Sequence, residues 1–293
     1  MKEFMIRTIS GVVFTALTLA SLIIVPHDPL PFLILFSFYL VRTDYEYLRL
    51  TIGKGKVVLK IVSMVAALLL FLALALILCF DHEADFSVYI LIVLLLLVIA
   101  IPVVDLLEGE KFYMSFSLSS LLYLALPFSL LSGVSAISVQ ISYSEAGSYY
   151  FDGWAIASLL IVMWMGDVGA YCIGTAFGQG ERGHKLMPSV SPKKSWEGVY
   201  GAVVLSVITA VVLRAFNLLL PQFPYLVSAL FGLVVCIFSV FGDLVESKIK
   251  RHFQKKDAGR IMPGHGGLLD RFDSGLLAWP AAFLFYLIAM FLY

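Results

Sequence analysis

Carboxylates and cations alternate in the segment GHGGLLDRFDSG, Gly264–Gly275, which comes directly before a long apolar stretch. Asp270 and Asp273 stand about one helical turn apart, and Arg271 lies between them. Mg²⁺ typically takes one or two carboxylates together with the phosphates of a substrate, so this mixture of charges favours a magnesium site. The sequence therefore predicts metal-assisted phosphate chemistry at this point.

Glycines in and before the same segment indicate an anion site. Gly264, Gly266 and Gly267 allow the backbone to approach a ligand closely, and successive amides in such a turn can form an anion-binding concavity. The pattern is not a P-loop, because no GK[ST] follows the glycines. His265 is compatible with a phosphate donor, a general acid or a turn residue. The cations around these glycines are Lys255, Lys256, Arg260 and Arg271.

Upstream, the stretch FGDLVESKIK predicts a helix with one polar face. Asp243, Glu246 or Ser247, and Lys250 recur at spacings of three, four and seven residues. We expect this helix to end at the cytoplasm, where the negative end of its dipole favours a bound cation. Asp243 is therefore a candidate metal ligand.

Two further motifs carry polar residues that suit the same chemistry. Asp167 lies inside the apolar stretch WMGDVGAYCIGTAFG, where a charge costs about 2.5 to 3.5 kcal/mol on insertion scales. A functional carboxylate is favoured there, and a protonated Asp bonded to a neighbouring helix is the alternative.

The motif SPKKSWEG offers Ser191, Lys193 and Lys194 as phosphate contacts. An ordinary basic cytoplasmic loop is the alternative. Gly166, Gly169, Gly174 and Gly178 are also compatible with close helix packing.

The elements that position these residues are membrane helices. The chain is 61% hydrophobic and 14% charged over 293 residues, whereas globular proteins are about 45 to 50% apolar and about 25% charged. About 20 apolar residues are needed to cross a bilayer. The sequence predicts an all-α polytopic protein with about nine transmembrane helices, at 8–25, 29–48, 57–80, 86–104, 112–131, 153–177, 198–220, 224–246 and 275–292.

Basic residues predict the orientation, because Lys and Arg collect in cytoplasmic loops. An N-terminus inside and a C-terminus outside place 19 of the 20 Lys and Arg residues on the cytoplasmic side, and only Arg214 falls outside. A cleaved signal peptide at 1–25 would reverse this balance, so an uncleaved first helix is favoured.

The spans predict a single integral membrane domain covering 1–293. Residues 1–150 are expected to be mainly scaffold, and 151–293 to form the catalytic half with cytoplasmic loops 178–197 and 247–274. The three cysteines, Cys79, Cys172 and Cys236, lie inside spans without paired spacing, so neither a disulfide framework nor a CxxC metal site is expected.

Three of these motifs together resemble one known family. The runs Ser247–Asp273, Gly166–Gly178 and Ser191–Gly198 are similar to the signature of the phosphatidate cytidylyltransferases, also called CDP-diacylglycerol synthases. The resemblance covers roughly the C-terminal 45% of the chain, and the N-terminal half is similar only in being polytopic. It implies transfer of CMP from CTP to phosphatidate, which gives CDP-diacylglycerol and pyrophosphate and requires Mg²⁺.

The resemblance also implies roles for individual residues. One or two Mg²⁺ ions would be held by Asp243, Asp270, Asp167 and Asp273. Catalytic residues would be Asp243, Asp270, Lys250, Arg271 and Ser247. Substrate-binding residues would be Lys193, Lys194, Ser191, Arg251, Lys256, Gly264, His265, Gly266 and Gly267.

The implied partners are CTP, phosphatidate and the bilayer, with no nucleic acid; a homodimer is left open. The implied location is the bacterial cytoplasmic (inner) membrane, with the active site facing the cytoplasm. A transporter would use Asp167 and Asp243 in an ion pathway, and a CTP-dependent lipid kinase would transfer the γ-phosphoryl group. Polar residues confined to one half of the chain disfavour the transporter, since transporter folds often show broken helices in both halves.

Overall fold

The computed structural model describes residues 2–25, 27–79, 101, 113–142, 151–179, 183–264 and 266–292. The predicted span 86–104 therefore lies outside the described residues except for Ile101, and His265 lies outside them as well. The chain folds into two compact units: unit 1 comprises Met1–Gly133 and Phe253–Phe272, and unit 2 comprises Val134–His252 and Asp273–Tyr293. The single-domain organisation stays a prediction.

Helices dominate the described residues, which confirms the predicted class. Within these ranges, seven helices are long and apolar enough to cross a membrane, so the chain is an integral membrane protein with several apolar helices. Each of the seven overlaps a predicted span, whereas the total of nine stays a prediction. The seven are Met5–Ile23, Val57–Leu78, Met114–Ile141, Gly153–Phe177, Trp196–Ala215, Tyr225–His252 and Leu269–Leu292.

The span predicted at 29–48 corresponds to helix α2 (Leu30–Thr51), which is not one of these seven. The C-terminal half of α2 carries Arg42, Asp44, Glu46 and Arg49. Charged residues are expensive in a bilayer unless they face protein, and both Asp44 and Glu46 are buried. The side chains of Asp44 and Glu46 on this helix therefore face other parts of the protein and not lipid.

Unit 1 contains α1 (Lys2–Ile23), α2, α3 (Val57–Cys79), α5 (Met114–Ser120), the π-helical turn η1 (Leu121–Ala125) and the short helix α10 (Leu269–Phe272). Its core is aromatic around Phe272. The ring of Phe272 lies 5.2 Å from that of Tyr39, 5.3 Å from that of Phe128 and 5.6 Å from that of Phe14, measured between centroids. Such tilted and edge-on pairs are favourable, so α10, which carries Asp270 and Arg271, is fixed to the helices of this unit.

The continuous helical stretch made of α5, η1 and α6 is longer than the predicted span 112–131. Helix α6 (Leu126–Ser142) continues η1, so residues expected to begin an outside loop at 132 are helical through 142. The π-helical turn ends two residues before Pro127, a residue that lacks an amide hydrogen and crowds the preceding turn. A local widening of the helix accommodates this proline without ending it.

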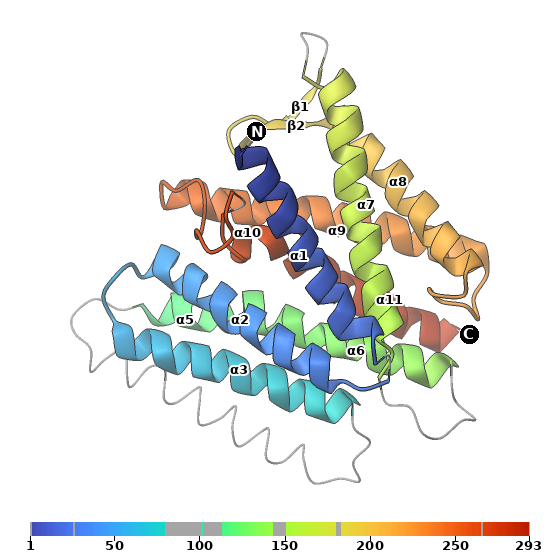
Figure 1. The fold of residues 1–293 in the computed structure, drawn as a ribbon, viewed down its shortest axis with the longest axis horizontal. Helices are drawn as coiled ribbons and strands as arrows, with labels where there is room; N and C mark the ends of the chain where they lie inside the picture. Colours follow the sequence, from blue (N-terminus) through green and yellow to red (C-terminus); the bar gives the residue numbers. More distant parts are fainter. Residues whose placement is uncertain are drawn as a thin grey trace. The chain divides into compact units, whose positions relative to one another are not determined.

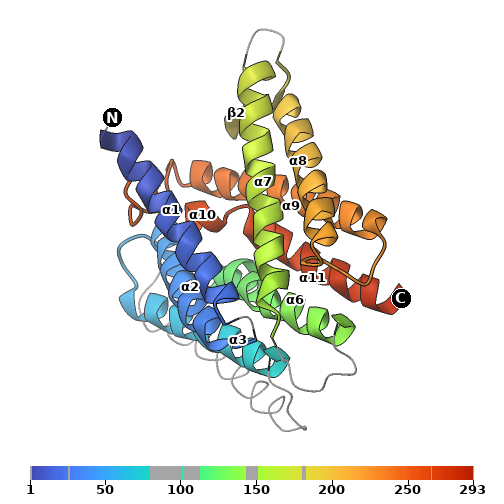
Figure 2. The same cartoon turned by 45° about the vertical axis from the view of Figure 1, so that its right-hand side comes forward.

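Unit 2 contains α7 (Gly153–Phe177), the strands β1 (Lys185–Met187) and β2 (Ser191–Ser195), α8 (Trp196–Ala215), α9 (Tyr225–His252) and α11 (Gly275–Leu292). Helices α7 and α8 run side by side in both views (Figures 1 and 2). Glycines make this contact: a Cβ at Gly169 would lie 2.3 Å from the Gly201 carbonyl oxygen, and one at Gly201 would lie 2.5 Å from that of Gly169. Gly169 therefore serves helix packing, one of the two interpretations of the motif.

Two short strands form an antiparallel hairpin inside the loop predicted at 178–197. Lys185 pairs with Ser195 and Met187 with Ser191. Ser195 then begins α8 as its N-cap, because its hydroxyl accepts a hydrogen bond of 3.2 Å from the Gly198 amide. The hairpin is a local addition to the helical fold, and it places Lys193 and Lys194 on an ordered strand.

Candidate functional site

The glycine-rich loop of unit 1, residues 253–268, is held in shape by the Asp270 carboxylate. Its Oδ2 atom accepts hydrogen bonds of 2.8 Å from the Gly267 amide and 3.1 Å from the Ala258 amide. One donor comes from the first half of the loop and the other from its end. Asp270, predicted as a metal ligand, therefore closes the loop on itself.

A second carboxylate, that of Glu46 on α2, packs against the same loop. Glu46 is 1% exposed, and its Oε2 atom accepts a hydrogen bond of 3.0 Å from the Leu269 amide. A Cβ at Gly259 or at Gly267 would lie 2.2 Å from a Glu46 carboxylate oxygen, so a side chain at either position would displace Glu46. Arg42 Nη2 lies 3.3 Å from Glu46 Oε1 and pairs with it. Sequence reasoning missed Glu46; its signal was the charges that interrupt the apolar stretch at 29–48.

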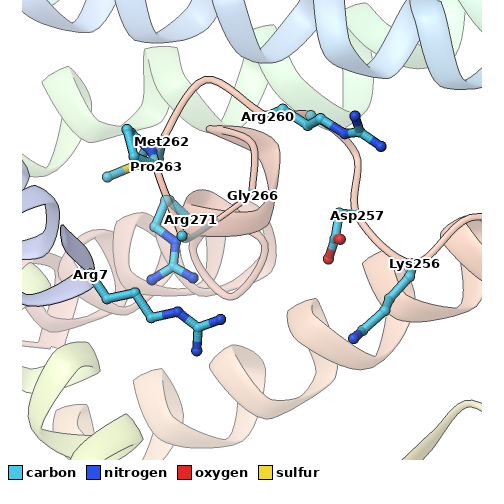
Figure 3. Close-up of a pocket in the computed structure, with 10 residues that line it drawn as sticks. Arg7, Lys256, Asp257, Arg260, Met262, Pro263, Gly266 and Arg271 are labelled. Atoms are coloured by element: carbon cyan, nitrogen blue, oxygen red, sulfur yellow. The ribbon is translucent and has the colours of Figure 1, made fainter. Parts of the chain in front are cut away.

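Residues of this loop line a cavity of about 590 Å³ (Figure 3). Of the residues that the structure describes, four cations line it, whereas Asp257 is the one acidic residue in the lining. A concave surface with this excess of positive charge favours anions. Sequence reasoning identified three of the cations but used Arg7 only for topology. The lining residues are Arg7, Lys256, Asp257, Gly259, Arg260, Met262, Pro263, Gly264, Gly266 and Arg271.

Backbone geometry at the rim of the cavity depends on two of the predicted glycines. Gly264 and Gly266 have φ angles of 75° and 87°, in the left-handed region that residues with a Cβ rarely adopt. The Met262 amide donates a 3.0 Å hydrogen bond to the Gly266 carbonyl, so the backbone at Met262 lies beside that at Gly266. The glycine pattern therefore forms a tight turn beside cationic side chains, as the sequence predicts.

In unit 2, Asp243 of α9 is the centre of a group of charged side chains. Lys194 Nζ lies 2.5 Å from Asp243 Oδ2, and the Ser247 hydroxyl donates a 3.2 Å hydrogen bond to Asp243 Oδ1. Glu246 and Lys250, which follow on the same helix, form an ion pair and are both buried. The spacing of three, four and seven residues thus places these groups together as predicted.

Asp273 and Asp167 complete this group. The Asp273 carboxylate lies within electrostatic range of Asp243, Glu246 and Asp167. The backbones also approach closely, since a Cβ at Gly242 would lie 2.6 Å from the Asp273 carbonyl oxygen. Hereafter we call this the carboxylate cluster: the acids Asp167, Asp243, Glu246 and Asp273 with the cations Lys194 and Lys250.

The predicted site residues are thus divided between the two units. Unit 1 contains Asp270, Arg271, Lys256, Gly264, Gly266 and Gly267. Unit 2 contains the cluster together with Ser191, Lys193 and Arg251. Ser191 and Lys193 lie on β2, and Arg251 lies in the last turn of α9. The predicted pairing of Asp243 with Asp270 on one metal ion stays a prediction.

The donors of the carboxylate cluster decide whether it suits a magnesium ion. Among the described residues, no three His, Cys, Asp or Glu side chains converge closely enough to hold a metal ion by themselves. Mg²⁺ needs only one or two carboxylates when substrate phosphates supply the other ligands. The cluster has four acids against two lysines, and Asp243 already contacts a cation, the Lys194 ammonium. These donors fit a divalent cation that arrives with a phosphate substrate.

Comparison with known proteins matches the chain to a family whose description is "Cytidylyltransferase family" over residues 5–289. Similar proteins named phosphatidate cytidylyltransferase occur in Bacillus subtilis, with 43% identity over 131 residues, and in Mycobacterium bovis, with 38% over 148 residues. The protein of that name in Staphylococcus epidermidis is 39% identical over 148 residues.

The matched segments cover 45%, 49% and 48% of this chain and 46%, 44% and 55% of the three relatives, respectively. The chain thus spans about half the length of the curated relatives it matches. The family match, by contrast, takes in both units and all but the ends of the sequence. The chain belongs to the cytidylyltransferase family.

Proposed function

We propose that the protein is a CTP:phosphatidate cytidylyltransferase, which transfers CMP from CTP to phosphatidate and releases pyrophosphate. The observation that carries the proposal is the cavity of about 590 Å³ lined by four cations and formed largely by residues 256–271. This segment lies within the run that resembles the family signature. The family match and the names of the relatives support the same activity.

The reaction needs no nucleophile from the protein. A phosphate oxygen of phosphatidate attacks the α-phosphorus of CTP and forms a new P–O bond. The bond from the α-phosphorus to the bridging oxygen breaks, and its electron pair leaves with pyrophosphate. The protein must hold the two anionic substrates in line and neutralise their charge, and both contributions can be large.

The residues of the two units supply complementary parts of this task. Arg271 and Lys256 in the cavity lining would neutralise phosphates, and Gly264 and Gly266, which line the same cavity, would present backbone amides, while Gly267 would help to shape the loop. Lys193, Lys194, Lys250, Arg251 and Ser191 would contact the substrates from unit 2, and Ser247 would donate a hydrogen bond. His265 remains a candidate phosphate contact on the basis of sequence alone.

Magnesium, when bound, would draw negative charge from the transferring phosphates. Asp243 and Asp270 would hold one ion, and Asp167 and Asp273 would support it or hold a second. Asp243 is the best supported ligand, because it already contacts a cation and belongs to a cluster with an excess of carboxylates. The hydrogen bonds of Asp270 to two amides give that residue a second task, the positioning of the loop.

The proposed location is the bacterial cytoplasmic membrane, with the active site on the cytoplasmic side where CTP is found. The distribution of basic residues supports this orientation. Phosphatidate would enter from the bilayer in which the apolar helices lie. A homodimer stays open.

The test uses purified protein in detergent with phosphatidate, Mg²⁺ and CTP labelled on either the α- or the γ-phosphorus. We expect α-label to appear in the lipid extract and γ-label in pyrophosphate. Transfer of γ-label to a lipid, with diacylglycerol as the acceptor, would instead identify a lipid kinase. Absence of label from lipid in both experiments would overturn the proposal and leave the transporter as the alternative.

A further inference from the structure

We infer that Arg7, on the first helix, is a phosphate-binding residue and that with Arg260 it completes a binding site for a phosphate group in the unit 1 cavity. The inference rests on the proposed function and adds Arg7, which the sequence did not place at the glycine loop. It also gives the N-terminal helix a part in substrate binding, beyond crossing the membrane. Arg7 and Arg260 both line the cavity together with Arg271 and Lys256.

Contacts within unit 1 hold Arg7 at the cavity. The Ser10 hydroxyl, on the next turn of α1, donates a 3.2 Å hydrogen bond to the Pro263 carbonyl oxygen. A Cβ at Gly264 would lie 2.5 Å from Arg7 Cγ, so the stem of the arginine packs against the glycine turn itself. Figure 3 shows the Arg7 side chain extending into the same space as that of Arg271. The position of Arg7 is therefore set by the loop.

The charges of the lining are those of an anion site. Among the described residues, four cations from three chain segments, namely α1, residues 256–260 and α10, converge on one concavity, and Asp257 is the one acid in its lining. Like charges brought together repel one another, and a bound anion relieves that repulsion. Arginine is suited to this role because its planar guanidinium can make paired hydrogen bonds to phosphate. The volume of about 590 Å³ lies within the range of small-molecule sites.

A basic residue near the cytoplasmic end of a first helix has a simpler explanation, the positive-inside rule. That rule requires only a positive charge near the membrane surface. It requires neither a contact between the arginine stem and a positive-φ glycine nor convergence with three other cations. The two explanations therefore differ in whether substitution of Arg7 changes ligand binding.

Two substrates of the proposed reaction carry the required chemistry. One source is the terminal phosphates of CTP, which leave as pyrophosphate, and the other is the phosphate head group of phosphatidate. Both would be bound by the same guanidinium groups. Binding of each to the same variants distinguishes them.

The experiment measures equilibrium binding of inorganic pyrophosphate, and separately of short-chain phosphatidate, to the purified full chain in detergent. The variants are Arg7→Gln and Arg7→Lys. Arg49→Gln is the matched control, because Arg49 is an exposed arginine of the same unit that does not line the cavity. Helical content measured by circular dichroism verifies that each variant is folded.

We expect Arg7→Gln to raise the dissociation constant of one of the two ligands roughly tenfold, as the loss of one charge-assisted hydrogen bond does. Arg7→Lys should have an intermediate effect, and Arg49→Gln should bind as the parent does. An effect on pyrophosphate assigns the cavity to the nucleotide, and an effect on phosphatidate assigns it to the lipid. Unchanged binding of both ligands in folded Arg7→Gln overturns the inference.

Failure of the inference and failure of the proposed function are distinguishable. If the parent protein binds pyrophosphate through Arg7 but transfers no CMP, the site stands and the activity does not. If the Arg7→Gln protein transfers CMP at the parent rate and binds both ligands with the parent dissociation constants, the activity stands and the site does not.

Discussion

The glycine loop of unit 1 and the carboxylate cluster of unit 2 use the same types of side chain in opposite ways. In the loop, the carboxylates of Asp270 and Glu46 accept hydrogen bonds from the backbone, and cations line the adjacent cavity. In the cluster, four carboxylates are grouped with two lysines. The first arrangement suits an anion and the second a cation. Either half of this comparison can be tested alone.

Asp243→Asn should have the largest effect, because it removes the carboxylate that contacts Lys194 and is proposed to hold magnesium. We expect turnover to fall at least about a hundredfold, since a metal provides several kcal/mol of charge stabilisation to such a reaction. The amide keeps the size of the side chain, so the protein should still fold. Activity at saturating CTP, measured against Mg²⁺ concentration, tests this expectation.

The competing explanation for Asp243 is a structural ion pair with Lys194. In that case Asp243→Asn would yield less folded protein, and the fraction that folds would retain turnover. Parent-rate turnover by well-folded Asp243→Asn protein would remove the cation site from the comparison.

Gly267→Ala should have the next largest effect, because it tests the packing that shapes the loop. The added Cβ would lie 2.2 Å from Glu46 Oε2 and 2.8 Å from the Gly259 amide nitrogen. Overpacking of this kind costs about 1 to 3 kcal/mol, and a displaced loop should lower kcat/KM by roughly a hundredfold when substrates are mispositioned by about 1 Å.

Gly55→Ala is the matched control for this change. Gly55 also lies in unit 1, but a Cβ there has no neighbour within 4 Å. Its activity should equal that of the parent protein. Equal activity of the Gly267→Ala and Gly55→Ala proteins would show that the close packing of the loop is irrelevant to turnover.

Glu46→Gln should have a smaller effect, because glutamine can still accept a hydrogen bond from the Leu269 amide. What it loses is the charged pair with Arg42, which lies 3.3 Å away in a buried setting. A hydrogen bond to a charged group contributes about 1.5 to 3 kcal/mol, so we expect a roughly thirtyfold loss of kcat/KM. Glu46→Asp, which keeps the charge but shortens the side chain, should be impaired less if charge rather than reach is decisive.

The fold was largely predictable from the sequence, because apolar segments of about 20 residues have few alternatives to helix in a membrane. Span 153–177 coincides with α7 at both ends. Asp152 caps its beginning by accepting hydrogen bonds from the Trp154 and Ala155 amides. The span 112–131 was placed too short, because the polar residues that follow it belong to α6, which runs to Ser142, and the Ser132 hydroxyl bonds to the Ser129 carbonyl inside that helix.

The site was predictable only where its chemistry follows the local spacing. Asp243, Ser247 and Lys250 follow the period of a helix, and their shared face could be inferred. Glu46 and Arg7 act on residues 259–269, more than 200 positions away in sequence. No local pattern contains such a contact. Both were visible only as charges within or beside apolar stretches, for which topology offered a sufficient explanation.

The smallest expected effect concerns the two adjacent lysines of β2, which the sequence did not distinguish. Lys194 Nζ contacts Asp243 Oδ2, whereas Lys193 is an exposed residue whose carbonyl accepts a hydrogen bond from Gln179 Nε2. A partly exposed ion pair contributes at most about 1 kcal/mol to stability, so both Lys→Ala proteins should fold.

Lys194→Ala should reduce kcat/KM for CTP several-fold more than Lys193→Ala, because it alone alters the charge balance at Asp243. The pair can be separated further by combining each lysine substitution with Asp243→Asn. Residues in direct contact show coupling energies of about 0.5 to 3 kcal/mol in a double-mutant cycle, whereas independent residues add. We expect coupling of Asp243 to Lys194 but not to Lys193. Equal coupling to both lysines would mean that the Lys194 contact has no special role and that strand β2 acts only as a basic surface.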